Sequence, residues 1–215
     1  VYFDAEAGQW VTFVEKAYLY DAAGNVIREE DALGYASGTG DTIDQRIASG
    51  YGTTYSYDLA GHVLTVLDPV SKDRGLAFSA KYTYDALGRK TCAIDADGNS
   101  IYYYYTDAGK LRYSTWVSAD KSTSQLIEAY DYDLLGHATA HTDANSKVTI
   151  YAYNALGKVS KVTLLDDQYL IGLITYYQYD SAGRLSRMWT SAGLLETYTY
   201  DSLGRTLSKT QSAAD

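Results

Sequence analysis

The chain has 215 residues, with 18 Lys and Arg against 27 Asp and Glu, which gives a formal net charge of −9. An acidic surface repels phosphate backbones and therefore argues against nucleic-acid binding. The sequence lacks the run of about 18 apolar residues that a membrane-spanning helix requires.

The residue composition favours β structure. The chain holds 24 Tyr but only 3 Phe and 3 Trp, and 18 Gly against a single Pro. Tyrosine suits a half-buried strand, because its ring is apolar while its hydroxyl can stay in water. Glycine at this frequency indicates many turns that need a positive φ.

The ends and the single cysteine add two expectations. The chain begins Val1-Tyr2-Phe3-Asp4, with no initiator Met and no basic leader region. We therefore expect an excised or processed piece without a signal peptide. The lone Cys92 cannot form an intramolecular disulfide, and it neither supports nor excludes export.

One motif, Tyr-x-Tyr-Asp-x-x-Gly, recurs eight times and is the dominant signal. Its copies span residues 18–24, 55–61, 82–88, 103–109, 130–136, 151–157, 177–183 and 198–204. The second Tyr, the Asp and the Gly of successive copies are Tyr20, Asp21, Gly24; Tyr57, Asp58, Gly61; Tyr84, Asp85, Gly88; Tyr105, Gly109; Tyr132, Asp133, Gly136; Tyr153, Gly157; Tyr179, Asp180, Gly183; and Tyr200, Asp201, Gly204. Thr106 and Asn154 replace Asp in the fourth and sixth copies.

Three features vary between copies, in chain order. Five glycines between residues 34 and 52 predict an inserted, mobile glycine-rich loop after the first copy. Second turns are expected at residues 95–99 and 143–146, so that a 21-residue repeat contains two strands and two turns. Longer spacings predict longer second loops or strands, as between Leu164 and Tyr176.

Each motif predicts a tight hairpin. The Asp side chain can accept hydrogen bonds from backbone N–H groups two residues on, and Gly at the fourth position can adopt the left-handed conformation. A type I turn followed by such a residue is a common hairpin loop with a bulge. The predicted register places Tyr20 opposite Val26, Tyr18 opposite Arg28, and Tyr179 opposite Leu185. Cross-strand ion pairs are expected on the opposite face: Asp85–Arg89, Asp180–Arg184 and Asp201–Arg205.

The predicted fold is all-β. About eight hairpins, or about 16 antiparallel strands, form one strongly curved sheet that is open or partly spiralled, in a single domain over residues 1–215. A single hairpin buries too little surface to offset its ordering entropy, so adjacent hairpins must stabilise one another.

The stretch Tyr179-Asp180-Ser181-Ala182-Gly183-Arg184-Leu185 resembles the YD repeats of the RHS family, and the resemblance covers roughly residues 16–210. It implies a long β-sheet strip that spirals into a hollow shell. Bacterial members, including insecticidal toxin-complex subunits and contact-dependent competition proteins, enclose a C-terminal toxin, whereas teneurins use a similar shell in adhesion. Tyrosine repeats of this class have also been linked to carbohydrate binding.

The chain departs from the family in two ways. Full shells usually need more than eight repeats, and toxin members carry a core segment with aspartate-dependent self-cleavage after them. The dipeptide Asp68-Pro69 lies inside the array and does not resemble that segment. We therefore expect a segment of the shell wall that includes neither a toxin domain nor the self-cleaving core segment.

The resulting expectation is a non-enzymatic structural segment of a secreted or surface bacterial protein that scaffolds or encapsulates a toxin or partner. Expected partners are the rest of a larger RHS-type polypeptide, a toxin cargo, a second copy through exposed strand edges, or glycans, with no nucleic acid. The alternative is a carbohydrate- or surface-binding module that uses rows of Tyr rings, with Tyr102 and Tyr104 as its candidate ligand surface. A remnant autoprotease is a third hypothesis.

No catalytic residue, cofactor or metal site is predicted. Residues 95–99 alternate oxygen ligands as a calcium loop does, but they coincide with an expected turn. His137 and His141 lie four apart on a strand, about 13 Å, which is too far to share an ion. Cys92 is expected to be a small buried strand residue rather than a nucleophile.

Overall fold

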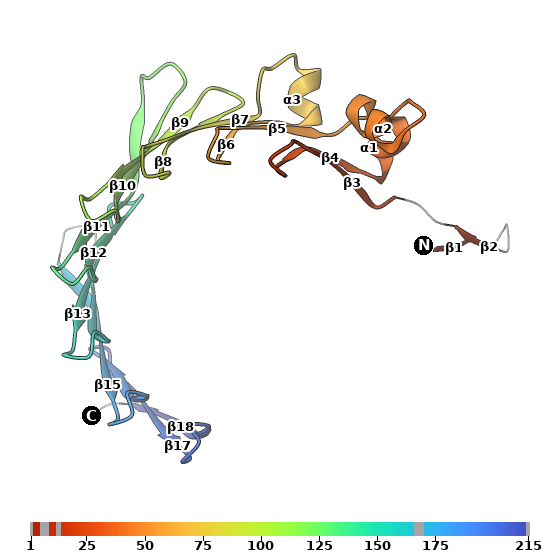
Figure 1. Cartoon of the computed structure of the whole chain (residues 1–215). Helices are drawn as coiled ribbons and strands as arrows, with labels where there is room; N and C mark the ends of the chain where they lie inside the picture. Colours follow the sequence, from red (N-terminus) through yellow and green to blue (C-terminus); the bar gives the residue numbers. More distant parts are fainter. Residues whose placement is uncertain (1, 5–8, 12–13, 166–169, 214–215) are drawn as a thin grey trace. The chain divides into compact units, whose positions relative to one another are not determined.

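The computed structural model describes residues 2–4, 9–11, 14–165 and 170–213, which form eighteen strands and three short helices (Figure 1). The strands are β1 Tyr2–Asp4, β2 Gln9–Val11, β3 Lys16–Tyr20, β4 Val26–Asp31, β5 Thr53–Tyr57, β6 Val63–Leu67, β7 Ala80–Tyr84, β8 Lys90–Asp95, β9 Ser100–Tyr105, β10 Leu111–Val117, β11 Ser124–Tyr132, β12 Ala138–Asp143, β13 Val148–Tyr153, β14 Val159–Leu165, β15 Ile171–Tyr179, β16 Leu185–Thr190, β17 Leu194–Tyr200 and β18 Thr206–Ala213. The helices are α1 Ala32–Ser37, α2 Ile43–Ser49 and α3 Pro69–Asp73.

The strands confirm the predicted hairpin array. β3 to β18 form one 16-stranded sheet whose strand order follows the chain order, and β1 pairs with β2 separately. Every pairing described is antiparallel, as consecutive hairpins require. The chain divides into two compact units, Val1–Tyr102 with Val117–Thr123, and Tyr103–Trp116 with Ser124–Asp215.

The pairing within a hairpin is longer than the pairing between hairpins. β15 and β16, which form one hairpin, pair at five positions from Thr175–Thr190 to Tyr179–Leu185. β16 and β17, which belong to successive hairpins, pair at only three positions, from Arg187–Thr197 to Trp189–Leu195. The boundary between repeats therefore has fewer backbone hydrogen bonds, and side chains must supply part of its cohesion.

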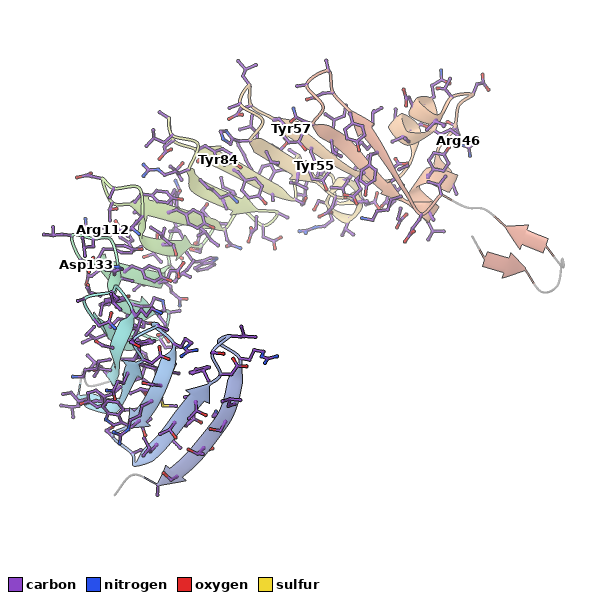
Figure 2. All side chains as sticks on the ribbon, turned by 60° about the horizontal axis from the view of Figure 1, so that its bottom comes forward. Arg46, Tyr55, Tyr57, Tyr84, Arg112 and Asp133 are labelled. Carbon is purple, nitrogen blue, oxygen red and sulfur yellow. The ribbon has the colours of Figure 1, made fainter. Side chains whose placement is uncertain are left out.

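The sheet is a single layer with very little core. Among the described residues, the buried apolar side chains are Ala17, Ile47 and Cys92. Side chains project from both faces of the strands (Figure 2). The stability of such a layer must come from contacts between neighbouring strands on each face.

The glycine-rich segment 34–52, predicted as a mobile loop, instead contains α1 and α2, which pack against β3 and β4 (Figure 1). The side chain of Asp31 caps α1 by accepting from the Gly34 N–H at 2.8 Å, and Thr42 with Gln45 forms a capping box on α2. A Cβ on Gly34 would lie 2.3 Å from a backbone oxygen, and a Cβ on Gly50 would lie 2.4 Å from a carboxylate oxygen. Several of the glycines thus permit close packing, which the loop prediction did not consider.

The insert covers a buried ion pair. Arg28 Nε donates to Glu30 Oε1 at 2.8 Å, and Glu30 is 1% exposed. The Asp68-Pro69 dipeptide has a local role of the same kind, because Asp68 accepts from the Ser71 N–H at 2.7 Å and Pro69 begins α3. Both features position short helices on unit 1.

Candidate functional site

The motif turns have the predicted geometry, shown best by the seventh repeat. The Asp180 carboxylate accepts from the backbone N–H groups of Ala182 and Arg184 at 3.0 and 2.8 Å, and from Arg184 Nε at 2.7 Å. Gly183 has φ +76°, a value that disfavours any residue with a Cβ. The expected ion pairs Asp85–Arg89, Asp180–Arg184 and Asp201–Arg205 are all present.

The two copies without Asp keep the same turn. Asn154 Oδ1 accepts from the N–H groups of Leu156 and Lys158 at 2.9 and 3.1 Å. Thr106 Oγ1 accepts from the Lys110 N–H at 3.1 Å. A neutral acceptor is therefore sufficient for the turn, and the charge of Asp serves the side chain that follows Gly.

The register next to each turn is confirmed, but it shifts by one residue further along the hairpin. Tyr20 faces Val26 and Tyr179 faces Leu185, as predicted. Tyr18, however, faces Glu29 and not Arg28. A bulge directly before the second Tyr of the motif inserts an extra residue in the partner strand, and the simple alternation used for the prediction did not include it.

In six of the eight repeats, the second motif Tyr binds the preceding repeat through its hydroxyl. Tyr179 Oη donates to the carbonyl oxygen of Val159 at 2.8 Å, and Val159 is the residue that faces Tyr153 in the preceding hairpin. The same bond recurs from Tyr57 to Val26, Tyr84 to Val63, Tyr132 to Leu111, Tyr153 to Ala138 and Tyr200 to Leu185, at 2.6–2.9 Å. The hydroxyl thus connects hairpins beyond the point where their backbone pairing ends.

In five repeats, the residue after the motif Gly covers the Tyr ring of the next repeat. His62 stacks on Tyr84 with ring centroids 4.8 Å apart, and His137 stacks on Tyr153 at 4.6 Å. In three other repeats a cationic group covers the ring. Lys110 lies over Tyr132, Lys158 over Tyr179 and Arg184 over Tyr200, with the ammonium nitrogen or guanidinium carbon 4.7–5.3 Å from the ring centroid. These contacts are cation–π or stacking interactions of roughly 0.5–1.5 kcal/mol each.

We call this set of contacts the inter-repeat joint. It consists of the residue at the motif Asp position, the residue after Gly, the second Tyr of the next repeat, and the carbonyl that this Tyr binds. Where an Asp is present it orients the His or Arg that covers the ring. The covering side chain packs on the ring, and the ring hydroxyl donates to the backbone carbonyl of the preceding hairpin. Sequence reasoning assigned the residue after Gly to its Asp alone, although the regular His, Lys or Arg at that position was the available signal.

Burial and hydrogen bonds shift the pKa values of Tyr and Asp residues in the joints. Burial raises the pKa of Tyr57, Tyr84 and Tyr179, so these hydroxyls remain protonated donors well into alkaline solution. The hydrogen bond with His62 holds the pKa of Asp58 below its ordinary value, and His137 does the same for Asp133.

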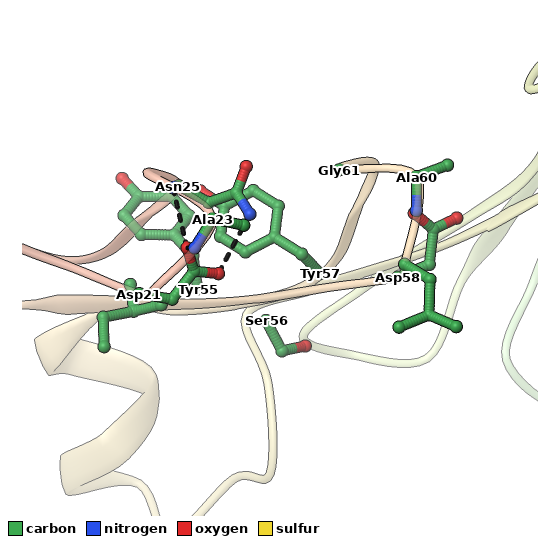
Figure 3. A pocket seen from close by; sticks show the side chains of 11 residues that line it. Asp21, Ala23, Asn25, Tyr55, Ser56, Tyr57, Asp58, Ala60 and Gly61 are labelled. Carbon is green, nitrogen blue, oxygen red and sulfur yellow. Dashed lines mark hydrogen bonds between the residues drawn. The ribbon is translucent and has the colours of Figure 1, made fainter.

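A depression lies beside the first joint. Asn25, which bonds Asp21 at 2.9 Å, is shorter than the His, Lys or Arg of the other joints. The depression measures about 600 Å³ and is lined by Asp21, Asn25, Tyr57 and Asp58 among others (Figure 3). The Asp21 and Asp58 carboxylates that line it already accept hydrogen bonds from backbone N–H groups of their own turns.

The candidate ligand residues Tyr102 and Tyr104 differ in their surroundings. Tyr102 is half-buried and lies opposite Cys92 in the β8–β9 pairing. Tyr104 is 42% exposed and stacks on Tyr113 at a centroid distance of 4.3 Å. Of the two, Tyr104 is the more exposed, although Tyr113 covers one face of its ring.

The remaining candidates have structural surroundings. Cys92 is 8% exposed, and burial raises the pKa of its thiol, which disfavours the thiolate. Asp95 Oδ1 accepts from the N–H groups of Asp97 and Asn99 at 2.9 Å, as a turn residue does. His137 bonds Asp133, whereas His141 stacks on Tyr130, so the two imidazoles serve different contacts.

Across the part of the chain that the structure describes, no three His, Cys, Asp or Glu residues gather as metal ligands. No helix there is long and apolar enough to cross a membrane.

The fold and its joints define a class: an antiparallel β-hairpin repeat protein with tyrosine-mediated contacts between repeats. Within that class, the family model described as the RHS repeat matches residues 132–167 and 179–214. The predicted resemblance is confirmed: these two stretches match the RHS repeat. No curated protein matches the chain significantly.

Solved structures with a similar fold are crystal structures of TcdB2-TccC3. One has a TM-score of 0.56 at 19% identity and covers 91% of this chain and 12% of that chain. The complex TcdB2-TccC3-Cdc42 gives 0.55 at 18% identity, with 91% and 12% covered. TcdB2-TccC3 without its hypervariable C-terminal region gives 0.54 at 16%, with 92% and 14% covered. At these identities the likeness shows the fold, and the chain spans about an eighth of those proteins' length.

Proposed function

We propose that this chain is a non-enzymatic wall segment of a secreted or surface RHS-type protein, and that it scaffolds or encloses a polypeptide cargo. The observation that carries the proposal is the inter-repeat joint, which uses the motif Asp and Tyr residues to hold hairpins together. Side chains committed to such contacts are poor candidates for catalysis, because a catalytic group must be free to reach a substrate. The fold shared with TcdB2-TccC3 supports a structural role.

A single-layer sheet suits this role. It presents a large area per residue, and contacts between adjacent repeats can propagate its stability along the array. The exposed leucines at motif turns, such as Leu87, Leu134 and Leu203, lie at the tips of hairpins and outside any core.

Limited proteolysis of the longest natural polypeptide that contains residues 1–215 tests enclosure. Segments outside this chain should be cleaved at least about tenfold more slowly in the native protein than after urea unfolding, because a surrounding wall excludes the protease. Joint variants such as Tyr153→Ala should remove this protection. Equal cleavage in native and unfolded protein would refute enclosure.

A carbohydrate-binding role is the second candidate. Its support is the exposed ring of Tyr104 stacked on Tyr113, since exposed aromatic faces stack well on sugars. A glycan array separates the two roles: binding that Tyr104→Ala abolishes and Tyr102→Ala weakens less would favour it. No signal above background would remove it.

A further inference from the structure

A cavity of about 560 Å³ lies in unit 1 between the helical insert and α3. It is lined by residues from α1, from the segment that follows α2 and from α3, and Figure 1 shows the three helices in the same part of the chain. Cavities of about 300–1,000 Å³ are typical of small-molecule sites. The lining includes no motif turn and no inter-repeat joint, so this cavity is separate from the contacts that hold the array together.

Tyr51 connects the two walls of the cavity. Its backbone N–H donates to the carbonyl oxygen of Gly34 in the insert at 3.3 Å. Its hydroxyl donates to the Asp73 carboxylate and lies 3.3 Å from the carbonyl oxygen of Pro69, so the side chain is fixed on α3. The cavity is therefore formed before any ligand binds, which reduces the ordering cost of binding.

The walls present accessible apolar surface. Leu33 is 82% exposed and Tyr51 is 42% exposed, although both line the cavity, and Pro69 lies beside them. Small-molecule sites combine such apolar walls with a few polar groups that fix the orientation of the ligand.

Two groups of opposite charge line the cavity and lack a charged partner. Within the described part of the chain, Lys72 forms no ion pair, and Asp31 uses only its Oδ1 atom, which accepts from the Gly34 N–H at 2.8 Å. In the adjoining depression of about 340 Å³, by contrast, Lys16 and Glu29 pair with each other. The larger cavity thus offers one ammonium group and one carboxylate oxygen to a ligand.

A second carboxylate lies behind the cavity lining next to Asp31. A Cβ on Gly50 would lie 2.4 Å from Glu30 Oε2, so this backbone packs directly on the buried carboxylate. Arg28 bonds Glu30 Oε1, whereas Oε2 has no hydrogen-bond partner among the described residues. Buried polar atoms normally have a partner, so this end of the cavity favours a ligand group that donates hydrogen bonds.

We propose that this cavity binds a zwitterionic dipeptide with an apolar side chain. The ammonium group of the ligand bonds Asp31, its carboxylate pairs with Lys72, and its side chain packs on Leu33 and Tyr51. A sphere of 560 Å³ is about 10 Å across. An extended chain spans about 3.5 Å per residue, so one residue is too short to reach both charged walls, whereas two residues fit.

The test is an NMR titration of the isotope-labelled 215-residue chain with glycyl-leucine. Saturable shifts should be confined to amides near residues 31–37, 49–52 and 69–73, with a Kd of about 1 mM. N-acetyl-glycyl-leucine lacks the ammonium charge, and glycyl-leucinamide lacks the carboxylate. Each should bind about three- to tenfold more weakly, because it forfeits one charge-assisted contact at a partly exposed site.

Two variants assign the charged ends of the ligand. Lys72→Met should weaken binding of glycyl-leucine about three- to tenfold and leave binding of glycyl-leucinamide unchanged, because the amide has no carboxylate to lose. Asp31→Asn keeps an oxygen acceptor for the α1 cap, and it should weaken glycyl-leucine in the same way without affecting N-acetyl-glycyl-leucine. Lys147→Met, at an exposed turn of unit 2, is the matched control and should change neither affinity.

Three results would overturn the proposal: no saturable shift at about 20 mM glycyl-leucine, equal affinity for the free and the capped dipeptides, or an equal loss for glycyl-leucine and its amide in Lys72→Met. A general loss of structure in a variant would weaken all three ligands together, which the crossed ligands distinguish from the loss of one contact. None of these results bears on the proposed role as a wall segment, so the two proposals fail separately.

Discussion

Tyr179→Phe removes one oxygen atom from an inter-repeat joint and leaves the rest of it in place. The lost hydrogen bond is the 2.8 Å contact from the Tyr179 hydroxyl to the carbonyl of Val159. The ring remains beneath Lys158, whose ammonium lies 5.2 Å from the ring centroid. The substitution therefore isolates the hydroxyl from the packing of the ring.

The magnitude follows from the environment of the bond. A neutral hydrogen bond contributes about 0.5–1.5 kcal/mol net, and an acceptor left without its donor in a half-buried site places the loss near the middle of that range. We expect about 1 kcal/mol lower free energy of unfolding. Tyr179→Ala should cost more, about 3 kcal/mol, because roughly half of the 3–5 kcal/mol penalty for deleting a buried ring is added to the loss of the hydrogen bond.

The matched control is Tyr177→Phe, on the same strand and in the same motif. Within the described contacts the Tyr177 hydroxyl has no hydrogen-bond partner, so the free energy of unfolding should change by less than about 0.5 kcal/mol. The assay is urea unfolding followed by circular dichroism, combined with hydrogen exchange of the β14 and β15 amides, because repeat arrays can open locally. If the two Phe variants lose equal stability, the hydroxyl does not hold the repeats together.

Three further predictions follow from the turns. Gly183→Ala should lower the urea midpoint more than Gly24→Ala. Both glycines have positive φ, but only the new Cβ at 183 would lie 2.9 Å from the Lys158 ammonium and so displace it from the Tyr179 ring; equal midpoints would contradict this. Asp58 and Asp133 have pKa values below the ordinary 3.8, so their contribution to stability is present above that pH and is lost as the pH falls through their folded values; Asp58→Asn should reduce the loss of stability between pH 5 and pH 2. Leu134→Ser at an exposed turn tip should leave the thermal midpoint unchanged within about 2 °C, and a larger fall would show that the tip is packed.

The sequence was sufficient to predict the hairpins and their turns. Asp and Gly three residues apart specify a turn through local hydrogen bonds and a positive φ, and these requirements act within a few residues. Strand pairing between consecutive hairpins also follows from chain order. The register beside each turn, such as Tyr179 opposite Leu185, was therefore predictable, and so were the ion pairs of Asp with the residue after Gly.

Contacts that depend on distance across the sheet were decided only by the tertiary structure. A bulge places Tyr18 opposite Glu29, and no residue of the motif indicates in the sequence that this bulge is present. The hydroxyl of Tyr179 reaches a carbonyl 20 residues earlier, and no local pattern indicates that distance. The helices α1 and α2 depend on packing over the buried Arg28–Glu30 pair, because helices this short are not stable in isolation. Local chemistry thus determined each repeat, whereas the joints between repeats depend on the three-dimensional proximity of side chains from different hairpins.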